Sequence, residues 1–196
     1  EIGSGLVGSE MCIRDRIQCQ ILDANNKIES VKVDMGKAIL VPREIPVNSD
    51  LERFIAQPVT VDGKEYAMTC VSMGNPHAVV FLPEVDSLDL EKIGPSFEHH
   101  ELFPDRVNTE FVRVIDDHTL QMRVWERGSG ETFACGTGTC ATVVAAVLNG
   151  FCKKEEEILV HLRGGDLRII YHEDDTVTMI GPATYVFEGK MEYPNL

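Results

Sequence analysis

Short apolar runs recur along the chain, many of them alternating with polar residues, and polar turn residues separate them. Alternation with a period of two, rich in β-branched residues, is typical of strands in a half-buried sheet. The clearest hairpin surrounds Asp62-Gly63, a dipeptide that is favoured in two-residue turns. We expect strands at 17–22, 30–34, 59–61, 66–73, 78–82, 111–115, 119–125, 157–162, 167–171, 176–180 and 185–188.

Two stretches depart from this pattern and predict helices. Residues 88–97 follow polar capping residues, which favours a short helix. Residues 137–148 are apolar on nearly every side, as a fully enclosed helix must be. We expect this second helix to be capped near Thr137 or Thr139 and to end at Asn149-Gly150. Many strands with one enclosed helix predict the α+β class, with antiparallel strands wrapped around a central buried helix.

The composition supports a globular domain, because 43% of the 196 residues are hydrophobic. The 32 acidic and 18 basic residues give a formal net charge of −14. This charge disfavours binding to nucleic acids and to anionic membrane surfaces. No apolar run approaches the roughly 20 residues that span a bilayer. We therefore expect neither a nucleic-acid partner nor a membrane partner.

The six cysteines form no CxxC pair, and no histidine cluster completes a zinc site. This usage favours a reduced, cytoplasmic protein without a metal site. Cys70, Cys140 and Cys152 are interpreted as buried thiols that pack like small apolar side chains. Cys135 is different, because its neighbours carry chemistry of their own.

The first sixteen residues are expected to be foreign to the protein. Residues 6–16 resemble the translation of a transposon adaptor used in sequencing libraries, and residues 1–5 fit its variable index. Segments of this kind are set aside from fold reasoning. The alternative is a natural N-terminus rich in glycine and serine. On the first interpretation, native sequence begins near Ile17.

The segment from Glu126 to Cys140 carries the most suggestive chemistry of the chain. Cys135 stands at the mouth of the predicted helix, where exposed N–H groups and the helix dipole favour a thiolate. The backbone amides of Gly136 and Thr137 beside it can hold a carboxylate. One short motif therefore offers both a base and an anion clamp for an amino or hydroxy acid.

Other polar residues could complete a site for a small zwitterion. Asn75 and His77 flank a proline, which predicts a rigid turn. Asn75 and Asn108 can each accept from an ammonium and donate to a carboxylate. Glu126 can pair with a substrate ammonium, and Arg127 can bind a carboxylate with two hydrogen bonds. Taken singly, such residues are more often structural hydrogen-bonders, turn residues or solvated ion pairs, so the prediction depends on their joint occurrence.

Four motifs together point to one family. They are Met73-Gly74-Asn75-Pro76-His77, Arg106-Val107-Asn108, residues 126–132 and Ala134-Cys135-Gly136-Thr137-Gly138. This combination resembles diaminopimelate epimerase, and residues 33–36, 44–46, 181–183 and 186–189 are similar to that family too. The resemblance extends from about Ile17 to the end of the chain. Proline racemases and phenazine-type isomerases share the family's fold but not, as a rule, this combination.

The resemblance implies a cofactor-free isomerase that interconverts LL- and meso-2,6-diaminopimelate, on the way to lysine and peptidoglycan. In this family one cysteine, as a thiolate, removes the α-proton while a second, as a thiol, protonates the opposite face. Without an electron sink such as pyridoxal phosphate, donors on the substrate carboxylate must stabilise the carbanion. The full-length family is commonly homodimeric.

Individual roles are carried over from the same resemblance. It implies that Cys135 is the base in one direction and the acid in the other. It also implies that His77 and Glu126 tune this acid–base chemistry. The implied substrate-binding residues are Asn75, Asn108, Glu126, Arg127, Gly136 and Thr137.

The sequence departs from the family on its N-terminal side. The family's other catalytic cysteine lies in a Cys-Gly-Asn-Gly-type motif of an N-terminal domain, and this chain has no such motif. We therefore expect most of the first domain to be missing and the chain alone to be inactive. In the expected organisation, residues 17–34 are a remnant of the first domain and residues 35–181 form the second of two pseudo-symmetric domains. Residues 182–196 then return to the first domain.

Two other functions remain open from the residues. One is a related cofactor-free racemase acting on proline or hydroxyproline, which Glu126-Arg127-Gly128 together with the Met73–His77 motif disfavours. The other is a non-catalytic module that binds a zwitterion and keeps binding after Cys135→Ser.

Overall fold

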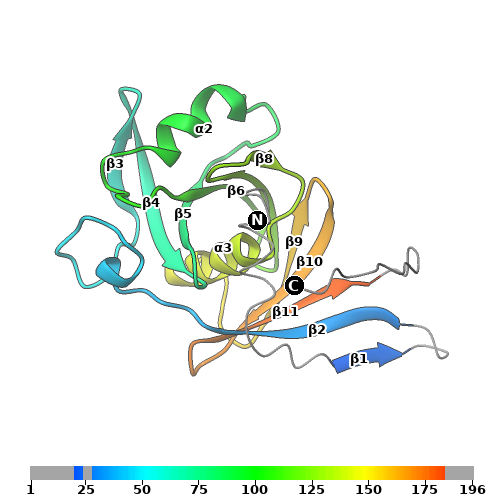
Figure 1. Cartoon of the computed structure of the whole chain (residues 1–196). Coiled ribbons are helices and arrows are strands. Elements are labelled where there is room, and N and C mark those ends of the chain that lie inside the picture. The colour runs from blue at the N-terminus through cyan, green and yellow to red at the C-terminus, as the bar shows by residue number, and fades with distance from the viewer. Residues whose placement is uncertain (1–19, 24–27, 184–196) are drawn as a thin grey trace, which may run out of the picture.

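The computed structural model describes residues 20–23 and 28–183, and its strands form one mixed sheet that curls around a helix (Figure 1). The predictions for residues 1–16, for a strand at 185–188 and for the return segment beyond 183 lie outside the described residues. The elements are β1 (Gln20–Asp23), β2 (Ile28–Lys37), a 3-10 turn (Pro42–Glu44), β3 (Gln57–Val61), β4 (Lys64–Ser72), β5 (Pro76–Phe81), α2 (Leu90–Glu98), β6 (Asn108–Asp116), β7 (Thr119–Glu126), β8 (Gly130–Thr132), α3 (Gly136–Leu148), β9 (Glu157–Leu162), β10 (Gly165–Tyr171) and β11 (Thr176–Pro182).

The strands expected within the described residues are confirmed, and most are longer than predicted. Asp62 and Gly63 connect β3 to β4 with φ angles of 49° and 76°, as a type I′ hairpin turn requires. The three-residue strand β8 was not predicted, because so short a segment carries no periodicity.

The sheet is largely antiparallel, as predicted, but it contains two parallel pairs that the sequence did not predict. The order is β1-β2-β11-β10-β9-β7-β6-β5-β4-β3, with β8 paired to β7 off this path. Two neighbouring pairs, β5 with β6 and β7 with β9, are parallel. Parallel neighbours need a crossover connection rather than a tight turn. Helix α2 lies in the first of these connections and α3 in the second.

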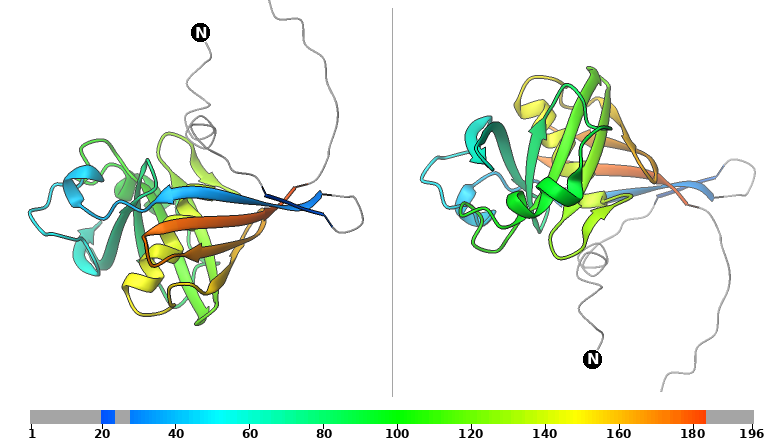
Figure 2. Two further views of the ribbon diagram at one scale, coloured as in Figure 1. Left: turned by 90° about the horizontal axis from the view of Figure 1, so that it is seen from below. Right: turned by 90° about the horizontal axis from the view of Figure 1, so that it is seen from above.

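Helix α3 is the enclosed helix that the sequence predicted. It contacts β4, β5, β6, β7, β10 and β11, and the curved sheet surrounds it (Figures 1 and 2). The sheet closes around the helix because Ile39, just after β2, forms an antiparallel bridge with Ser72 at the end of β4. Both N–H···O bonds of this bridge are 2.9 Å long. The helix ends as predicted, with Asn149 as its C-cap and Gly150 at a φ of 77°.

Helix α2 packs against a second core on the other face of the same strands. Alternate residues of β4 to β6 face the two cores: Val79 belongs to the core around α3, and Ala78 to the core around α2. Gly94 lies inside α2 although glycine is a poor helix former. An added Cβ there would lie 2.2 Å from the ring of Trp125, so only glycine lets this ring pack against the helix.

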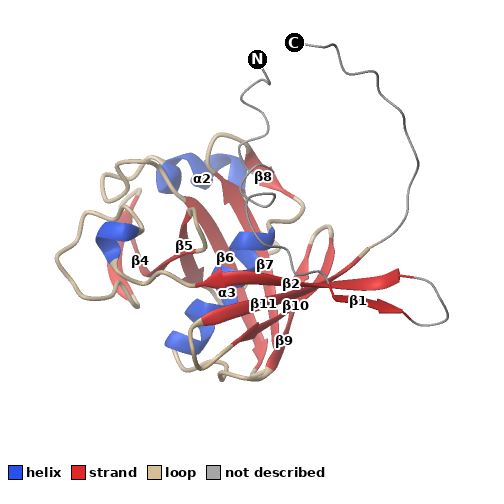
Figure 3. Ribbon diagram, turned by 60° about the horizontal axis from the view of Figure 1, so that its bottom comes forward, coloured by secondary structure: helices blue, strands red, loops and turns tan. Residues whose placement is uncertain are grey.

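β1, the first residues of β2 and the last residues of β11 extend away from the body of the domain (Figure 3), whereas Val177 of β11 lies in the core around α3 and Met35 of β2 packs against it. β2 runs without interruption through residues 34 and 35, and β11 through 181 and 182, where the sequence placed domain boundaries. The two strands pair antiparallel with each other. The division into domains remains a prediction.

Candidate active site

Three neighbouring strands bring the predicted site residues to one edge of the sheet. β5 begins directly after Asn75, β6 begins at Asn108, and β7 ends at Glu126. His77 is the register partner of Asn108 in the parallel pair β5–β6. Because β7 runs antiparallel to β6, its last residues lie beside the first residues of β6. The first turn of α3 reaches the same edge, where Thr137 contacts Asn75.

Cys135 is the N-cap of α3, which corrects the predicted cap at Thr137 or Thr139. Its backbone is extended, with a φ of −138°, and its Sγ accepts a hydrogen bond from the Gly138 N–H at 3.4 Å. The sulfur thus takes the place that a serine or aspartate oxygen usually occupies. The Thr139 hydroxyl instead donates to the Cys135 carbonyl at 2.7 Å.

The backbone N–H groups of Gly136 and Thr137 remain available at the mouth of α3. As first-turn donors they have no acceptor within the helix, and no other described group accepts from them. The helix dipole adds partial positive charge at this end. The structure therefore places beside Cys135 the two backbone amides that the sequence proposed as an anion clamp.

The pKa of Cys135 moves against the sequence expectation of a thiolate. Burial raises this pKa to about 12, and the acidic side chains Glu126 and Glu110 contribute to the rise. Hydrogen bonds from Thr137 and from the Gly138 amide lower the pKa, but they do not outweigh burial. A helix dipole contributes about 0.3–1 kcal/mol, whereas burial can shift a pKa by several units. The surroundings of Cys135 in this structure therefore favour its thiol form over the thiolate.

His77 is fully buried and connects to Cys135 through two other side chains. Its Nδ1 lies 2.7 Å from Glu110 Oε1, and its Nε2 lies 2.9 Å from Asn75 Oδ1. Asn75 Nδ2 lies 3.2 Å from Thr137 Oγ1, which in turn lies 3.5 Å from Cys135 Sγ. The predicted residues Asn75, His77, Thr137 and Cys135 therefore form one continuous chain of contacts.

The remaining predicted residues form a second group. Asn108 is buried, and its Oδ1 accepts from the Arg127 backbone N–H at 2.8 Å. The Arg127 guanidinium donates to the Asp105 carbonyl at 3.0 Å, so one of its nitrogens is already engaged. Glu126, next in the chain, is half-buried and accepts from the Thr132 hydroxyl. Asn108 thus fixes the backbone of the turn that carries the two charged residues.

The sequence did not predict how this turn is held. Glu98, at the end of α2, accepts from Trp125 Nε1 at 2.8 Å, from the Gly128 N–H at 2.9 Å and from Arg106 at 3.1 Å. Glu98 is almost fully buried, so the three donors compensate the cost of burying its charge. Nothing in the sequence around Glu98 signals this role.

Glu131 in β8, which follows this turn, is held by two arginines. Its carboxylate accepts two hydrogen bonds from Arg123, at 2.8 and 3.0 Å, and lies 2.9 Å from Arg163. Arg163 belongs to the turn between β9 and β10, so these contacts join that turn to β8. The loop that leads to Cys135 is therefore fastened from two directions.

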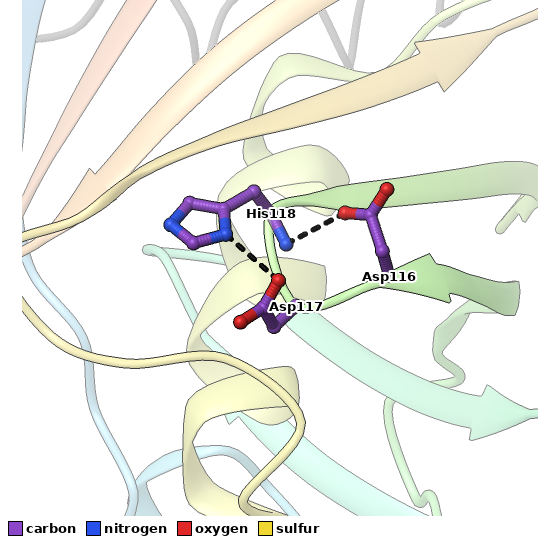
Figure 4. A group of neighbouring side chains, drawn as sticks. All are labelled: Asp116, Asp117 and His118. Carbon is purple, nitrogen blue, oxygen red and sulfur yellow. Dashed lines mark hydrogen bonds and ion pairs between the residues drawn. The ribbon is translucent and has the colours of Figure 1, made fainter.

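A separate cluster of metal-ligand types is a turn rather than part of this site (Figure 4). At the turn between β6 and β7, the His118 backbone N–H donates to Asp116 Oδ1 and its Nδ1 lies beside Asp117 Oδ1, both at 2.9 Å, while its Nε2 lies 3.2 Å from Glu156. All three residues of the cluster are exposed. The cluster lies at the far end of β6 from Asn108, about 25 Å away at the usual rise per strand residue.

The fold is similar to that of two solved structures. It resembles a hydroxyproline epimerase from Agrobacterium vitis, with a TM-score of 0.59 at 15% identity over 85% of this chain and 54% of that one. It also resembles a probable proline racemase from Agrobacterium radiobacter K84, with a TM-score of 0.58 at 11% identity over 87% of this chain and 57% of that one. The chain therefore has the α+β fold of these amino-acid racemases and epimerases.

The sequence narrows this class to one family. The model of the diaminopimelate epimerase family matches residues 69–186, which include every residue of the site described above. A diaminopimelate epimerase from Acetivibrio thermocellus is 58% identical over 173 residues, and one from Agathobacter rectalis is 54% identical over 175 residues. The chain belongs to the diaminopimelate epimerase family. The matches cover 88% and 85% of this chain but 61% of each relative, so the chain spans about three fifths of their length.

The described residues contain no helix long and apolar enough to cross a bilayer.

Proposed function

We propose that the protein interconverts LL- and meso-2,6-diaminopimelate by proton exchange at the α-carbon, with Cys135 as the acid–base group on one face. Membership of the diaminopimelate epimerase family supports this function. The observation that carries it is the mouth of α3, where Cys135 Sγ caps the helix beside two available amides. We further propose that the whole protein is a homodimer in the lysine and peptidoglycan pathway.

The charges around the helix mouth suit an α-amino acid. The substrate carboxylate binds to the N–H groups of Gly136 and Thr137, which favour negative charge. The substrate ammonium pairs with Glu126, whose charge otherwise raises the pKa of Cys135. These two contacts place the α-carbon over Cys135 Sγ. A bound ammonium also offsets the repulsion from Glu126 and so makes the thiolate of Cys135 more accessible.

The proton balance assigns Cys135 two roles. As a thiolate it takes the α-proton, and the electron pair stays on the α-carbon as a carbanion. The amides on the carboxylate stabilise the charge that spreads onto its oxygens. A second acid then protonates the opposite face. In the reverse direction Cys135 is the thiol that protonates the carbanion, and its high pKa suits this direction.

The opposite-face group is not one of the other cysteines with described side chains. Cys70 packs in the core around α2, Cys140 is fully buried inside α3, and Cys152 lies beyond the C-terminal end of α3, so none of the three lies at the helix mouth beside Cys135. We therefore propose that this polypeptide by itself acts on a single face of the substrate. It should exchange the α-hydrogen with solvent while the configuration is retained.

Solvent exchange in D₂O tests the function directly. Each stereoisomer of diaminopimelate is incubated with the 196-residue chain, and NMR follows both the loss of the α-hydrogen signal and the configuration. We expect exchange with retention at one stereocentre. Cys135→Ala abolishes this exchange, whereas the control Cys152→Ala leaves it unchanged. Exchange that survives Cys135→Ala contradicts the role of Cys135, and inversion at enzyme-like rates contradicts the single-face proposal.

The same assay separates the alternatives. Proline and hydroxyproline serve as comparison substrates, and preferential exchange of either one favours a proline-type racemase. A non-catalytic module shifts the amide signals of Gly136 and Thr137 when diaminopimelate is added, in wild type and in Cys135→Ser alike, without any exchange.

A further inference from the structure

A buried carboxyl group lies behind His77, and no substrate could reach it. Glu110 in β6 has no exposed surface, and its Oε1 lies 2.7 Å from His77 Nδ1. Its other oxygen, Oε2, is buried without a hydrogen-bond partner. Oε1 also packs directly against α3, because an added Cβ on Gly138 would lie 2.5 Å from it. Glu110 is thus enclosed between β5, β6 and the first turn of α3.

This environment favours the neutral form of Glu110. An ionised carboxylate would leave a charged oxygen buried without a donor, which is far more costly than an unpaired carbonyl oxygen of a neutral acid. Burial raises the pKa of Glu110, and repulsion from Glu126 adds to the rise, although His77 opposes both. As a neutral acid, Glu110 carries a hydrogen that it can donate to His77 Nδ1.

The protonation of Glu110 fixes the direction of every hydrogen bond that follows. When Nδ1 of His77 accepts, the ring hydrogen is on Nε2, which therefore donates to Asn75 Oδ1 at 2.9 Å. The Asn75 amide then donates through Nδ2 to Thr137 Oγ1 at 3.2 Å. The Thr137 hydroxyl hydrogen is left to point at Cys135 Sγ, 3.5 Å away.

The other tautomer of His77 would reverse the whole chain. With the hydrogen on Nδ1, Nε2 would accept and the Asn75 side chain would turn over to donate to it. Thr137 would then donate to Asn75, and the Cys135 thiol would become the donor to Thr137. One arrangement stabilises a thiolate at Cys135, and the other stabilises a thiol.

We propose that Glu110 is a positioning residue: as a neutral carboxylic acid it fixes the Nε2–H tautomer of His77 and so directs a chain of donors onto Cys135 Sγ. The chain lowers the cost of forming the thiolate in a buried place. The groups that face Cys135 are Glu126 from β7, Glu110 from β6 and the donors of Thr137 and Gly138 from α3. Among these, only Glu126 then repels the thiolate by a full charge.

The proposal concerns the thiol on which the proposed function rests, but its tests need no turnover. The first test is the protonation of His77 in the intact chain, measured from imidazole nitrogen shifts in a ¹⁵N-histidine sample. A His77→Gln sample identifies its signals among the six histidines. We expect hydrogen on Nε2 alone near neutral pH. A ring protonated on Nδ1 alone, or on both nitrogens, overturns the proposal.

The second test compares two substitutions at Glu110 of similar size. Glu110→Gln keeps a donor to His77 Nδ1, whereas Glu110→Met removes it. Peptide-resolved mass spectrometry follows the alkylation of Cys135 as pH is varied, which separates its signal from those of the other cysteines. We expect Glu110→Met to slow alkylation about 10-fold, equivalent to one pKa unit, or 1.36 kcal/mol. We expect Glu110→Gln to stay within about 3-fold of wild type.

Each outcome of this comparison decides the proposal. If Glu110 were ionised, Glu110→Gln would remove a negative charge and speed alkylation, which contradicts the neutral acid. An unchanged profile in folded Glu110→Met contradicts the donor chain. Thermal melting of each variant shows whether it folds. If Glu110→Met does not fold, Glu110→Gln and the His77 shifts still decide the question.

Discussion

Replacing Gly138 by alanine tests how tightly Glu110 is packed against the start of α3. The added Cβ would lie 2.5 Å from Glu110 Oε1 and 3.2 Å from Cys135 Sγ. Ordinary non-bonded contacts begin near 3.5 Å, so the carboxyl group must move by about 1 Å. Glu110 is fully buried and bonded to His77 at 2.7 Å, so this movement breaks or distorts that bond.

The expected cost of this substitution follows from two opposing contributions. Overpacking a well-filled interior costs about 1–3 kcal/mol. Alanine recovers up to about 1 kcal/mol over glycine through its helix propensity. We therefore expect Gly138→Ala to lower the free energy of unfolding by about 1–2 kcal/mol. For a chain of this size, that corresponds to a decrease in Tm of about 2–8 °C.

Gly136→Ala is the matched control, because it adds the same methyl group one half-turn earlier in the same helix. Its nearest neighbour is Met179, with Sδ at 3.3 Å and Cε at 3.6 Å, the flexible end of a side chain that can move aside. We expect its unfolding free energy to stay within about 0.5 kcal/mol of wild type. The assays are urea and thermal unfolding, together with Cys135 alkylation. The reasoning is refuted if Gly138→Ala is as stable as Gly136→Ala and leaves Cys135 alkylation unchanged.

Three further predictions concern the loop around the site. Glu98→Gln places an NH₂ donor opposite groups that already donate, so we expect the free energy of unfolding in urea to fall by about 1–3 kcal/mol. The amide hydrogen of Gly128 should also exchange faster with solvent, and an unchanged exchange rate contradicts the prediction. Glu126→Gln removes a charge that raises the pKa of Cys135, so the alkylation midpoint should fall below about 12, and a profile equal to wild type contradicts this. The pKa of Glu131 is lowered by its two arginines despite partial burial, so its stabilisation is complete above its ordinary pKa of 4.5 and is lost as the pH falls further. When the free energy of unfolding is measured from pH 7 to 3, we expect it to fall less steeply with decreasing pH in Glu131→Gln than in wild type. The same pH dependence in both proteins would contradict this prediction.

Features of the fold that depend on residues close together in the sequence could be predicted. The enclosed helix was visible because residues 137–148 are apolar on all sides, and the β3–β4 hairpin because Asp62-Gly63 fits one turn type. The parallel pairing of β5 with β6 was not visible, because it depends on how distant segments pack. Local periodicity shows that a strand exists but does not identify its neighbours.

The candidate site divides in the same way. The cluster around Cys135 was predicted because its residues occur together in short motifs, and the structure brings them to one edge. Its thiol state was missed, since the dipole of a helix mouth can be inferred from sequence whereas the burial of a sulfur atom cannot. Glu110 was missed because its significance comes from His77, 33 residues away in the chain. A lone acid in an apolar strand was the only signal.

The parallel pairing of β5 with β6 also affects when the candidate site can assemble during folding. The hairpins β3–β4, β4–β5 and β6–β7 join neighbours in sequence, so they can form early. The β5–β6 contact must first close the long segment that contains α2, and His77 and Asn108 of the candidate site do not meet until it does. Trp125 is the chain's one tryptophan, and it is buried against α2 through Glu98. Its fluorescence therefore reports the docking of α2 against β6 and β7 during refolding, without any added label.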